Sequence, residues 1–195
     1  LGYKTWKGAT SVSNGIGQGE LVATPIQLAN MTAAIANRGY YYTPHIIKES
    51  DHGPIDSAFI TPRQTTIAPK HFEVVIDGMY AVFETGTAKG SRIPHITQCG
   101  KTGTAQNPHG QDHSIFVSFA PKDQPKIALA VIIENGYWGS RWAAPIASLM
   151  TEMYLTDTIT RPALEARMFE GHLHEEYRQQ HVAIYGEDST YQANF

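Results

Sequence analysis

Residues 100–106 read Gly-Lys-Thr-Gly-Thr-Ala-Gln and close the first of three short runs that have the composition of β-strands. These runs span residues 95–106, 113–120 and 126–134, and segments rich in turn-forming residues separate them. Consecutive strands with such short links must be antiparallel neighbours, because a parallel pair needs a long crossover connection. The Gly-Lys-Thr-Gly segment is therefore predicted to lie on a strand of an antiparallel sheet.

Helices are predicted on both sides of these strands. The first begins at Thr24-Pro25, where threonine caps free N–H groups and proline suits the first helical position, and Gly39 fits a left-handed cap after its end. Apolar residues recur at helical spacing in two further segments, residues 69–84 and 143–155. A strand is expected over residues 40–47, and loops over residues 1–20 and 48–68. This order predicts the α+β class, an antiparallel sheet flanked by helices.

Composition and charge narrow the class of protein. The chain has 195 residues, of which 42% are hydrophobic and 17% charged, as in one folded domain of ordinary size. The formal net charge is -3, so no basic field indicates nucleic-acid binding. All of this excess negative charge lies in residues 161–195. We therefore divide the chain into a folded portion, residues 1–155, and a polar acidic tail, residues 156–195. A helix can begin at Arg161-Pro162, whereas residues 186–195 offer little to bury.

The redox and targeting signals are few. Cys99 is the one cysteine, so the chain cannot form an internal disulfide. No run approaches the roughly 18–20 apolar residues that span a bilayer. The chain begins at Leu1 without an initiator methionine or a signal peptide, so any targeting signal is expected upstream of the sequence.

Two mechanisms compete for the segment around Lys101. A phosphate-binding P-loop requires Gly-x-x-x-x-Gly-Lys-Ser/Thr, but His95 stands where its first glycine belongs, and more strand follows where a helix should begin. The alternative is the Lys-Thr-Gly box of penicillin-recognising serine enzymes. There the lysine charge favours an anionic substrate, the glycine lets a substrate backbone approach, and the next hydroxyl binds a carboxylate. A match of only four residues could also be a turn that has this sequence by chance.

Several further blocks match a known family in the same order. They are Gly15–Gly19, Ala23–Ala29, Gly100–Gln106, Phe116–Pro121, Ile127–Gly136 and Ala143–Ala147. Through them the chain resembles the elongation-type class B penicillin-binding proteins, the penicillin-binding protein 2 family, over most of residues 14–155. The loop Gly136–Ser140 departs from the usual glycine-rich form, and residues 156–195 match no motif of the family.

This resemblance implies part of a penicillin-binding, β-lactamase-like transpeptidase fold. It implies a peptidoglycan D,D-transpeptidase that cross-links stem peptides through a serine acyl-enzyme and binds β-lactams, with no metal or organic cofactor. Lys101 would support the proton network of the site electrostatically. Thr102 and Thr104 would line the substrate cleft, and the Thr104 N–H would be one of two oxyanion donors. Gly103 and Gln106 complete the implied substrate-binding set.

The family's nucleophile is missing from the sequence. The family uses Ser-x-x-Lys, yet no serine here has a lysine three places on, and no Ser-x-Asn or Ser-x-Asp box is present. Both boxes precede Lys-Thr-Gly in the family, so we interpret the chain as a C-terminal piece that is inactive alone. Two alternatives stay open: a non-catalytic interaction module of the cell-elongation machinery, and a β-lactamase or penicillin sensor. The blocks Gly15–Gly19 and Thr24–Ala29 argue against the latter by resemblance.

Partners and location follow from the same resemblance. The implied partners are stem peptides, β-lactams and proteins of the elongation machinery, and no nucleic acid. The implied location is the periplasmic face of the bacterial inner membrane, with an N-terminal anchor that this sequence does not contain. The missing strands would leave an open sheet edge, so we expect the chain to dimerise or exchange strands.

The remaining candidates have plainer interpretations. His172, His174 and His181 have no ligand spacing with matching partners, so we expect solvated surface rather than a metal site. His109 and His113 are interpreted as parts of a turn and a strand start, and Cys99 as a small buried hydrophobe. Gly15-x-Gly17-x-Gly19 lacks the dinucleotide-binding spacing and indicates a tight turn.

Overall fold

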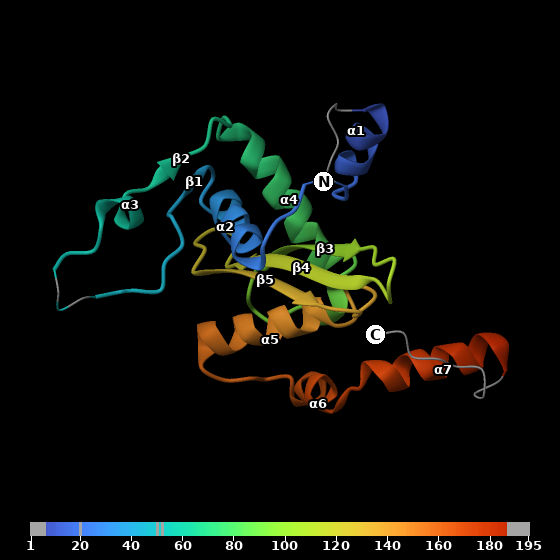
Figure 1. Cartoon of the computed structure of the whole chain (residues 1–195). Coiled ribbons are helices and arrows are strands. Elements are labelled where there is room, and N and C mark those ends of the chain that lie inside the picture. Colours follow the sequence, from blue (N-terminus) through green and yellow to red (C-terminus); the bar gives the residue numbers. More distant parts are fainter. Residues whose placement is uncertain (1–6, 20, 50, 52, 187–195) are drawn as a thin grey trace.

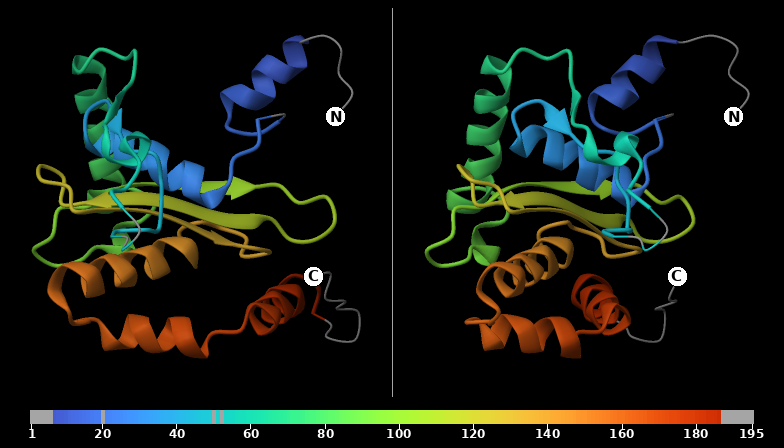
Figure 2. Two further views of the ribbon diagram at one scale, coloured as in Figure 1. Left: turned by 60° about the vertical axis from the view of Figure 1, so that its left-hand side comes forward. Right: turned by 90° about the vertical axis from the view of Figure 1, so that its left-hand side faces the viewer.

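A three-stranded antiparallel sheet lies between two helical layers (Figure 1). The computed structural model describes residues 7–19, 21–49, 51 and 53–186. The sheet runs in the order β3 (Cys99–Ala105), β4 (His113–Ala120) and β5 (Ile127–Ile133). Helix α2 (Pro25–Ala36) and most of α4 (Lys70–Glu84) cover one face, and α5 (Ala143–Thr156) covers the other, as Figure 2 shows. The last turn of α4 reaches the α5 side with Phe83. The predicted α+β class is confirmed.

All three predicted strands are present, but β3 and β5 are shorter than predicted. β4 has the predicted bounds, and the register pairs Gly103 with Ile115 and Lys101 with Val117. β3 begins at Cys99 rather than residue 95, because His95 adopts φ 65° and the backbone turns there instead of extending. A left-handed residue interrupts the pleat, so the strand cannot start before that turn.

The first predicted helix is confirmed with its caps. At the start of α2, the Gln27 N–H donates to Thr24 Oγ1 at 3.4 Å and the Thr24 N–H donates to Gln27 Oε1 at 2.8 Å, a capping box. Gly39 follows its end at φ 118°, and its N–H donates to the Ala34 carbonyl. Glycine pays no steric cost in that region of backbone space.

Three expectations for the N-terminal half are wrong. The expected strand over residues 40–47 is only β1 (Tyr40–Tyr41), which pairs with β2 (Arg63–Gln64). In the part of the chain that the structure describes, no strand pairs with residues 42–47. Short helices occupy two expected loops: α1 (Gly8–Gly15) and α3 (Ser57–Ile60). Neither helix buries a residue, so the sequence has no apolar periodicity from which either helix could be predicted. Residues 1–6, 20, 50 and 52 of the expected loops lie outside the described residues.

The core consists of one cluster on each face of the sheet. The face toward α2 and α4 buries Ala36, Phe72, Ile76, Met79, Cys99 and Phe119. The face toward α5 buries Phe83, Ala88, Phe116, Ala143, Ala144 and Ala147. The prediction that Cys99 is a buried hydrophobe is confirmed, and burial raises the pKa of its thiol to about 12. The thiol therefore stays neutral.

The C-terminal segment folds back beneath α5. It forms α6 (Pro162–Glu170), which confirms the helix predicted at Arg161-Pro162, and α7 (Leu173–Tyr185). Figure 2 shows α6 on the far side of α5 from the sheet, and α7 beside α5 on the same side of the sheet. Residues 187–195 of the tail lie outside the described residues. Among the helices of the described part of the chain, none combines the length and apolarity needed to cross a membrane.

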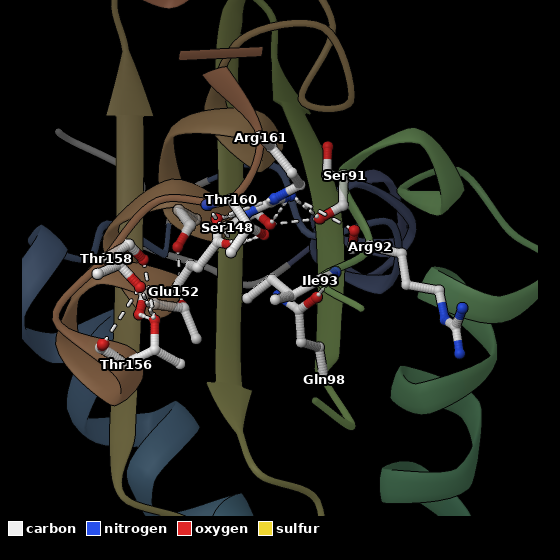
Figure 3. Close-up of polar contacts among 12 residues, drawn as sticks. Ser91, Arg92, Ile93, Gln98, Ser148, Glu152, Thr156, Thr158, Thr160 and Arg161 are labelled. Carbon is white, nitrogen blue, oxygen red and sulfur yellow. Dashed lines mark hydrogen bonds and ion pairs between the residues drawn. The ribbon is translucent and has the colours of Figure 1, made fainter. Parts of the chain in front are cut away.

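A buried ion pair fastens this segment to the core (Figure 3). Glu152 on α5 is 1% exposed, and the Arg161 Nε–H donates to its carboxylate at 3.0 Å. The Thr160 N–H donates to the same carboxylate at 3.1 Å, and Arg161 Nη1 donates to the Ser91 carbonyl at 2.9 Å. Burial opposes ionisation of Glu152, but these hydrogen bonds outweigh it and lower its pKa. The pair thereby links α5, α6 and the turn before β3.

Candidate active site

The Lys-Thr-Gly segment is held by the core at one end and presented to solvent at the other. Cys99 and Gly100 are buried, whereas Lys101 and Thr104 are exposed and Gly103 is half-buried. β4 pairs with one side of β3, and no strand in the described part of the chain pairs with the other. The free edge offers unpaired backbone N–H and C=O groups, which an extended peptide can bind as an added strand.

The two glycines of the segment have different surroundings. A Cβ on Gly100 would lie 2.5 Å from Phe116 Cζ and 3.0 Å from Phe83 Cε2, so the core itself requires glycine there. A Cβ on Gly103 would lie 3.4 Å from Ile115 Cβ, at ordinary contact distance. Among the described residues, nothing forbids a side chain at Gly103, so the core does not explain a glycine at this position.

Lys101 carries an uncompensated charge at the exposed edge. Its Nζ donates to the Thr102 carbonyl at 2.6 Å, and it takes part in none of the ion pairs among the described residues. An ammonium group that has no carboxylate partner among the described residues creates a positive potential beside the open strand edge. The arrangement therefore favours a ligand that carries a carboxylate.

Thr87 also lies at this strand edge, and no pattern in the sequence predicts it there. Its Oγ1 lies 3.1 Å from Thr102 Oγ1, and the two hydroxyls form a hydrogen bond. The turn after α4 holds it in place: a Cβ on Gly86 would lie 2.8 Å from Val82 Cα, and Ala88 is buried. Periodicity in the sequence marks only the end of a helix here, so it gives no signal for the contact.

A loop crosses directly behind the segment. A Cβ on Gly139 would lie 2.4 Å from the Ile115 carbonyl oxygen and 2.9 Å from that of Gly103, so the loop packs flat against the strands. Ser114 on β4 secures it, because its Oγ donates to the Trp138 carbonyl at 3.0 Å and accepts from the Ala143 N–H at 3.2 Å. The unusual sequence of residues 136–140 thus keeps glycine where the backbone touches the box.

The structure gives the other candidate residues peripheral positions. Gln106 is exposed just after β3 ends. The His109 N–H donates to Asn107 Oδ1 in a turn, and His113, the first residue of β4, accepts from the Asn135 N–H at Nδ1 at 3.0 Å. The two histidines therefore belong to a turn and to a strand start, as predicted. His172, His174 and His181 lie on or next to α7. In the described residues, no group of three or more His, Cys, Asp and Glu side chains is arranged to hold a metal ion.

Comparisons with known proteins show the family to which the chain belongs. The profile of the penicillin binding protein transpeptidase domain matches residues 2–152. A peptidoglycan D,D-transpeptidase, MrdA of Acinetobacter baumannii, is 35% identical over 172 residues, which cover 77% of this chain and 25% of the relative. The chain thus spans about a quarter of the length of the curated relatives it matches.

Solved structures of the same family share the fold. Pseudomonas aeruginosa PBP2 in complex with WCK 5153 matches with a TM-score of 0.70 and 40% identity over 79% of this chain and 35% of that chain. The imipenem acyl-enzyme of penicillin-binding protein A from M. tuberculosis matches with a TM-score of 0.64 and 28% identity, over 74% of this chain and 33% of that one. A complex between Helicobacter pylori PBP2 and MreC matches with a TM-score of 0.65 and 28% identity, over 80% of this chain and 29% of that chain. The chain therefore belongs to the penicillin binding protein transpeptidase domain family.

Proposed function

We propose that this chain supplies the substrate-binding strand of a peptidoglycan D,D-transpeptidase. The observation that carries the proposal is the exposed edge of β3, where the Lys101 ammonium group and the Thr102 and Thr104 hydroxyls border unpaired backbone. A peptide that ends in a carboxylate fits this edge as an added strand. The names of the relatives, a D,D-transpeptidase and an imipenem acyl-enzyme, support the assignment.

In the proposed reaction, a serine hydroxyl attacks the carbonyl carbon between the two terminal D-alanines of a stem peptide. The C–N bond breaks, the last D-alanine leaves with the proton, and an ester joins the peptide to the enzyme. The amine of a second stem peptide then attacks the ester, forms the cross-link and restores the serine. A β-lactam acylates the same serine when its ring opens.

Residues of β3 hold the substrate during these steps. Lys101 attracts the terminal carboxylate and supports the proton network, and the Thr102 and Thr104 hydroxyls donate to that carboxylate. The Thr104 N–H is one of two donors to the oxyanion. Gly103 lets the peptide backbone approach, and Gln106 extends the contact beyond the strand. No serine in the sequence is followed by lysine three places on, so the nucleophile comes from residues outside it.

Intact mass spectrometry with benzylpenicillin tests the assignment. The 195-residue chain is compared with the product of the longest reading frame that encodes it. We expect the longer protein to gain the mass of one benzylpenicillin and the chain alone to gain none. Acylation of the chain alone contradicts the assignment of the nucleophile to other residues. Absence of acylation in both proteins contradicts the transpeptidase assignment.

The alternative is a non-catalytic module that recruits elongation-machinery proteins. The complex of Helicobacter pylori PBP2 with MreC supports partners of this kind. Binding to an MreC-type protein without acylation of the longer protein would favour this alternative. Binding together with acylation assigns both properties to one protein.

We also propose that the protein acts at the periplasmic face of the inner membrane, because its peptidoglycan substrate is assembled there. An anchoring helix outside this sequence would hold it in place. Fractionation of cells that express the longest reading frame tests this location. Recovery from the cytosolic fraction contradicts it.

The second edge of the sheet favours self-association of the chain alone. All seven residues of β5, Ile-Ala-Leu-Ala-Val-Ile-Ile, are half-buried, and among the described residues β5 pairs only with β4. An apolar unpaired edge recruits another strand. We expect a dimer by light scattering and a monomer for Leu129→Lys, which places a charge on this edge. A monomeric mass for the unmodified chain at high concentration would count against the dimer.

A further inference from the structure

The loop between β5 and α5, residues 134–142, has a conformation that needs outside support. Asn135 and Tyr137 adopt φ 54° and 61°, in the left-handed region. Such a backbone is costly for residues with a Cβ, and most of all for a bulky one such as tyrosine. It persists where surrounding structure holds it in place.

Helix α7 contacts these same two residues. The Tyr177 hydroxyl donates to the Asn135 carbonyl. The Tyr177 ring also lies edge-on to the Tyr137 ring, with centroids 6.3 Å apart and an interplanar angle of 86°. Tyr177 is 7% exposed, so both contacts are shielded from water. One buried side chain therefore supports both left-handed residues.

The end of the loop is attached to the C-terminal helices a second time. Arg141 Nε and Glu176 Oε2 on α7 form an ion pair at 2.6 Å, and Arg167 Nη2 on α6 donates to the Arg141 carbonyl at 3.0 Å. Gly171, between the two helices, packs against Trp142, since a Cβ there would lie 2.4 Å from the indole Cη2. Both helices thus contribute to holding the loop.

The opposite side of the loop contacts the Lys-Thr-Gly strand. Gly139 packs against the backbone of Gly103 and Ile115, and the Trp138 carbonyl accepts from Ser114 Oγ. The loop is therefore clamped between the C-terminal helices and the strand that the site uses. The family profile ends at residue 152, so α6 and α7 lie beyond the matched region.

We propose that α6 and α7 form a brace for the active site, with Tyr177 and Glu176 as positioning residues that hold residues 134–142 against Gly103. Without the brace the loop relaxes toward an unstrained backbone, and the strand behind which it packs loses its support. Interactions that place a reacting group affect the chemical step more than the initial binding. The catalytic consequence rests on the proposed transpeptidase function, whereas the structural link does not.

Hydrogen exchange on the 195-residue chain tests the structural link. Tyr177→Phe removes only the hydroxyl, and Glu176→Gln removes only the charge. The matched controls are Tyr185→Phe, a 67% exposed tyrosine of the same helix, and Glu175→Gln, which pairs with Arg178 on its own helix. We expect about fivefold faster exchange in residues 101–105 and 136–141 for the first two variants, and no change in α4. Unchanged exchange in both segments overturns the proposal, and so does an equal increase throughout the chain.

Acylation kinetics of the longest reading frame test the catalytic consequence. With benzylpenicillin, Tyr177→Phe should lower the first-order acylation constant about fivefold while the dissociation constant of the initial complex changes little. Tyr177→Leu, which also loses the ring contact, should lower it further, and Tyr185→Phe should match the wild type. If wild type is acylated and Tyr177→Phe equals it, the positioning role is wrong. If wild type is not acylated, the proposed function is wrong, and hydrogen exchange alone then tests whether α6 and α7 brace the loop.

Discussion

The hydroxyl oxygens of Thr87 and Thr102 lie 3.1 Å apart, although fourteen residues stand between them in the chain. When Thr87 donates this hydrogen bond, the proton of Thr102 is free to point away from it, toward the open strand edge. Chains of hydrogen bonds also polarise one another, which makes Thr102 a better donor to an anion. In that arrangement the turn after α4 sets the direction in which a residue of the Lys-Thr-Gly box donates.

Replacing Thr87 by valine should weaken the proposed carboxylate contact. The side chain keeps its shape but loses the hydrogen bond, which is worth about 1 kcal/mol, or about fivefold in rate. We expect the second-order acylation constant of the longest reading frame with benzylpenicillin to fall by that factor. Thr87→Ser should restore it, because serine keeps the hydroxyl.

Thr85 offers the matched control for this test. It is an exposed threonine of the same turn, and its hydroxyl donates to the Ala81 carbonyl at 3.4 Å rather than to the box. Thr85→Val should leave the acylation constant unchanged. An equal decrease in Thr85→Val and Thr87→Val would show that the turn as a whole, and not the contact with Thr102, matters.

The two glycines of the box should respond in opposite ways to alanine. Gly100→Ala forces a methyl group into Phe116 and Phe83, and overpacking of this kind costs about 1–3 kcal/mol. Gly103→Ala meets no such crowding and should change the free energy of unfolding by less than about 1 kcal/mol, yet lower acylation of the longer protein. Urea unfolding of the 195-residue chain measures the first effect. Gly78→Ala, in open space on α4, should stabilise the chain by about 0.5–1 kcal/mol as a control.

Glu152→Gln should destabilise the chain strongly. Glu152 and Arg161 are 1% and 14% exposed, and removal of one partner of a buried ion pair costs about 3 kcal/mol or more. The exposed pair of Arg38 with Glu73, at 54% exposure of the glutamate, is the comparison: Glu73→Gln should cost less than about 1 kcal/mol. Similar losses in both variants, measured by urea unfolding, would contradict the special role of the buried pair.

The same carboxylate predicts a pH dependence. Because the folded-state pKa of Glu152 is lowered, its contribution to stability is fully present above its unfolded-state pKa of about 4.3. The contribution is lost as the pH falls through the lower folded-state pKa. We expect the stability difference between wild type and Glu152→Gln to shrink below about pH 4. A difference that stays constant down to the onset of acid unfolding would rule this out.

Cys99 should be unreactive in the folded chain. Its side chain is fully buried, and burial raises its pKa to about 12, so almost no thiolate forms near neutral pH. Iodoacetamide should label it in concentrated guanidinium and leave it unmodified in buffer. Rapid labelling in buffer would show that the β3 end of the core opens readily.

Local patterns were enough to predict most of the architecture and the family. The strands at residues 113–120 and 127–133 and the helices at residues 25–36, 70–84 and 143–156 follow from apolar spacing, turn residues and caps. These features act within a few residues of one another, so they can be interpreted without knowing where the chain goes. The same holds for Lys101–Thr104, which are consecutive on one strand.

The contacts around that strand depend instead on how distant segments pack. Thr87 reaches Thr102, Gly139 reaches Gly103, and Tyr177 reaches Asn135 only after the sheet and helices assemble. No spacing rule connects such residues, because three-dimensional packing brings them together. For the same reason the acidic C-terminal segment has the composition of a polar tail, whereas in the folded chain the buried Tyr177 and the ion pair of Glu176 hold the loop behind the box.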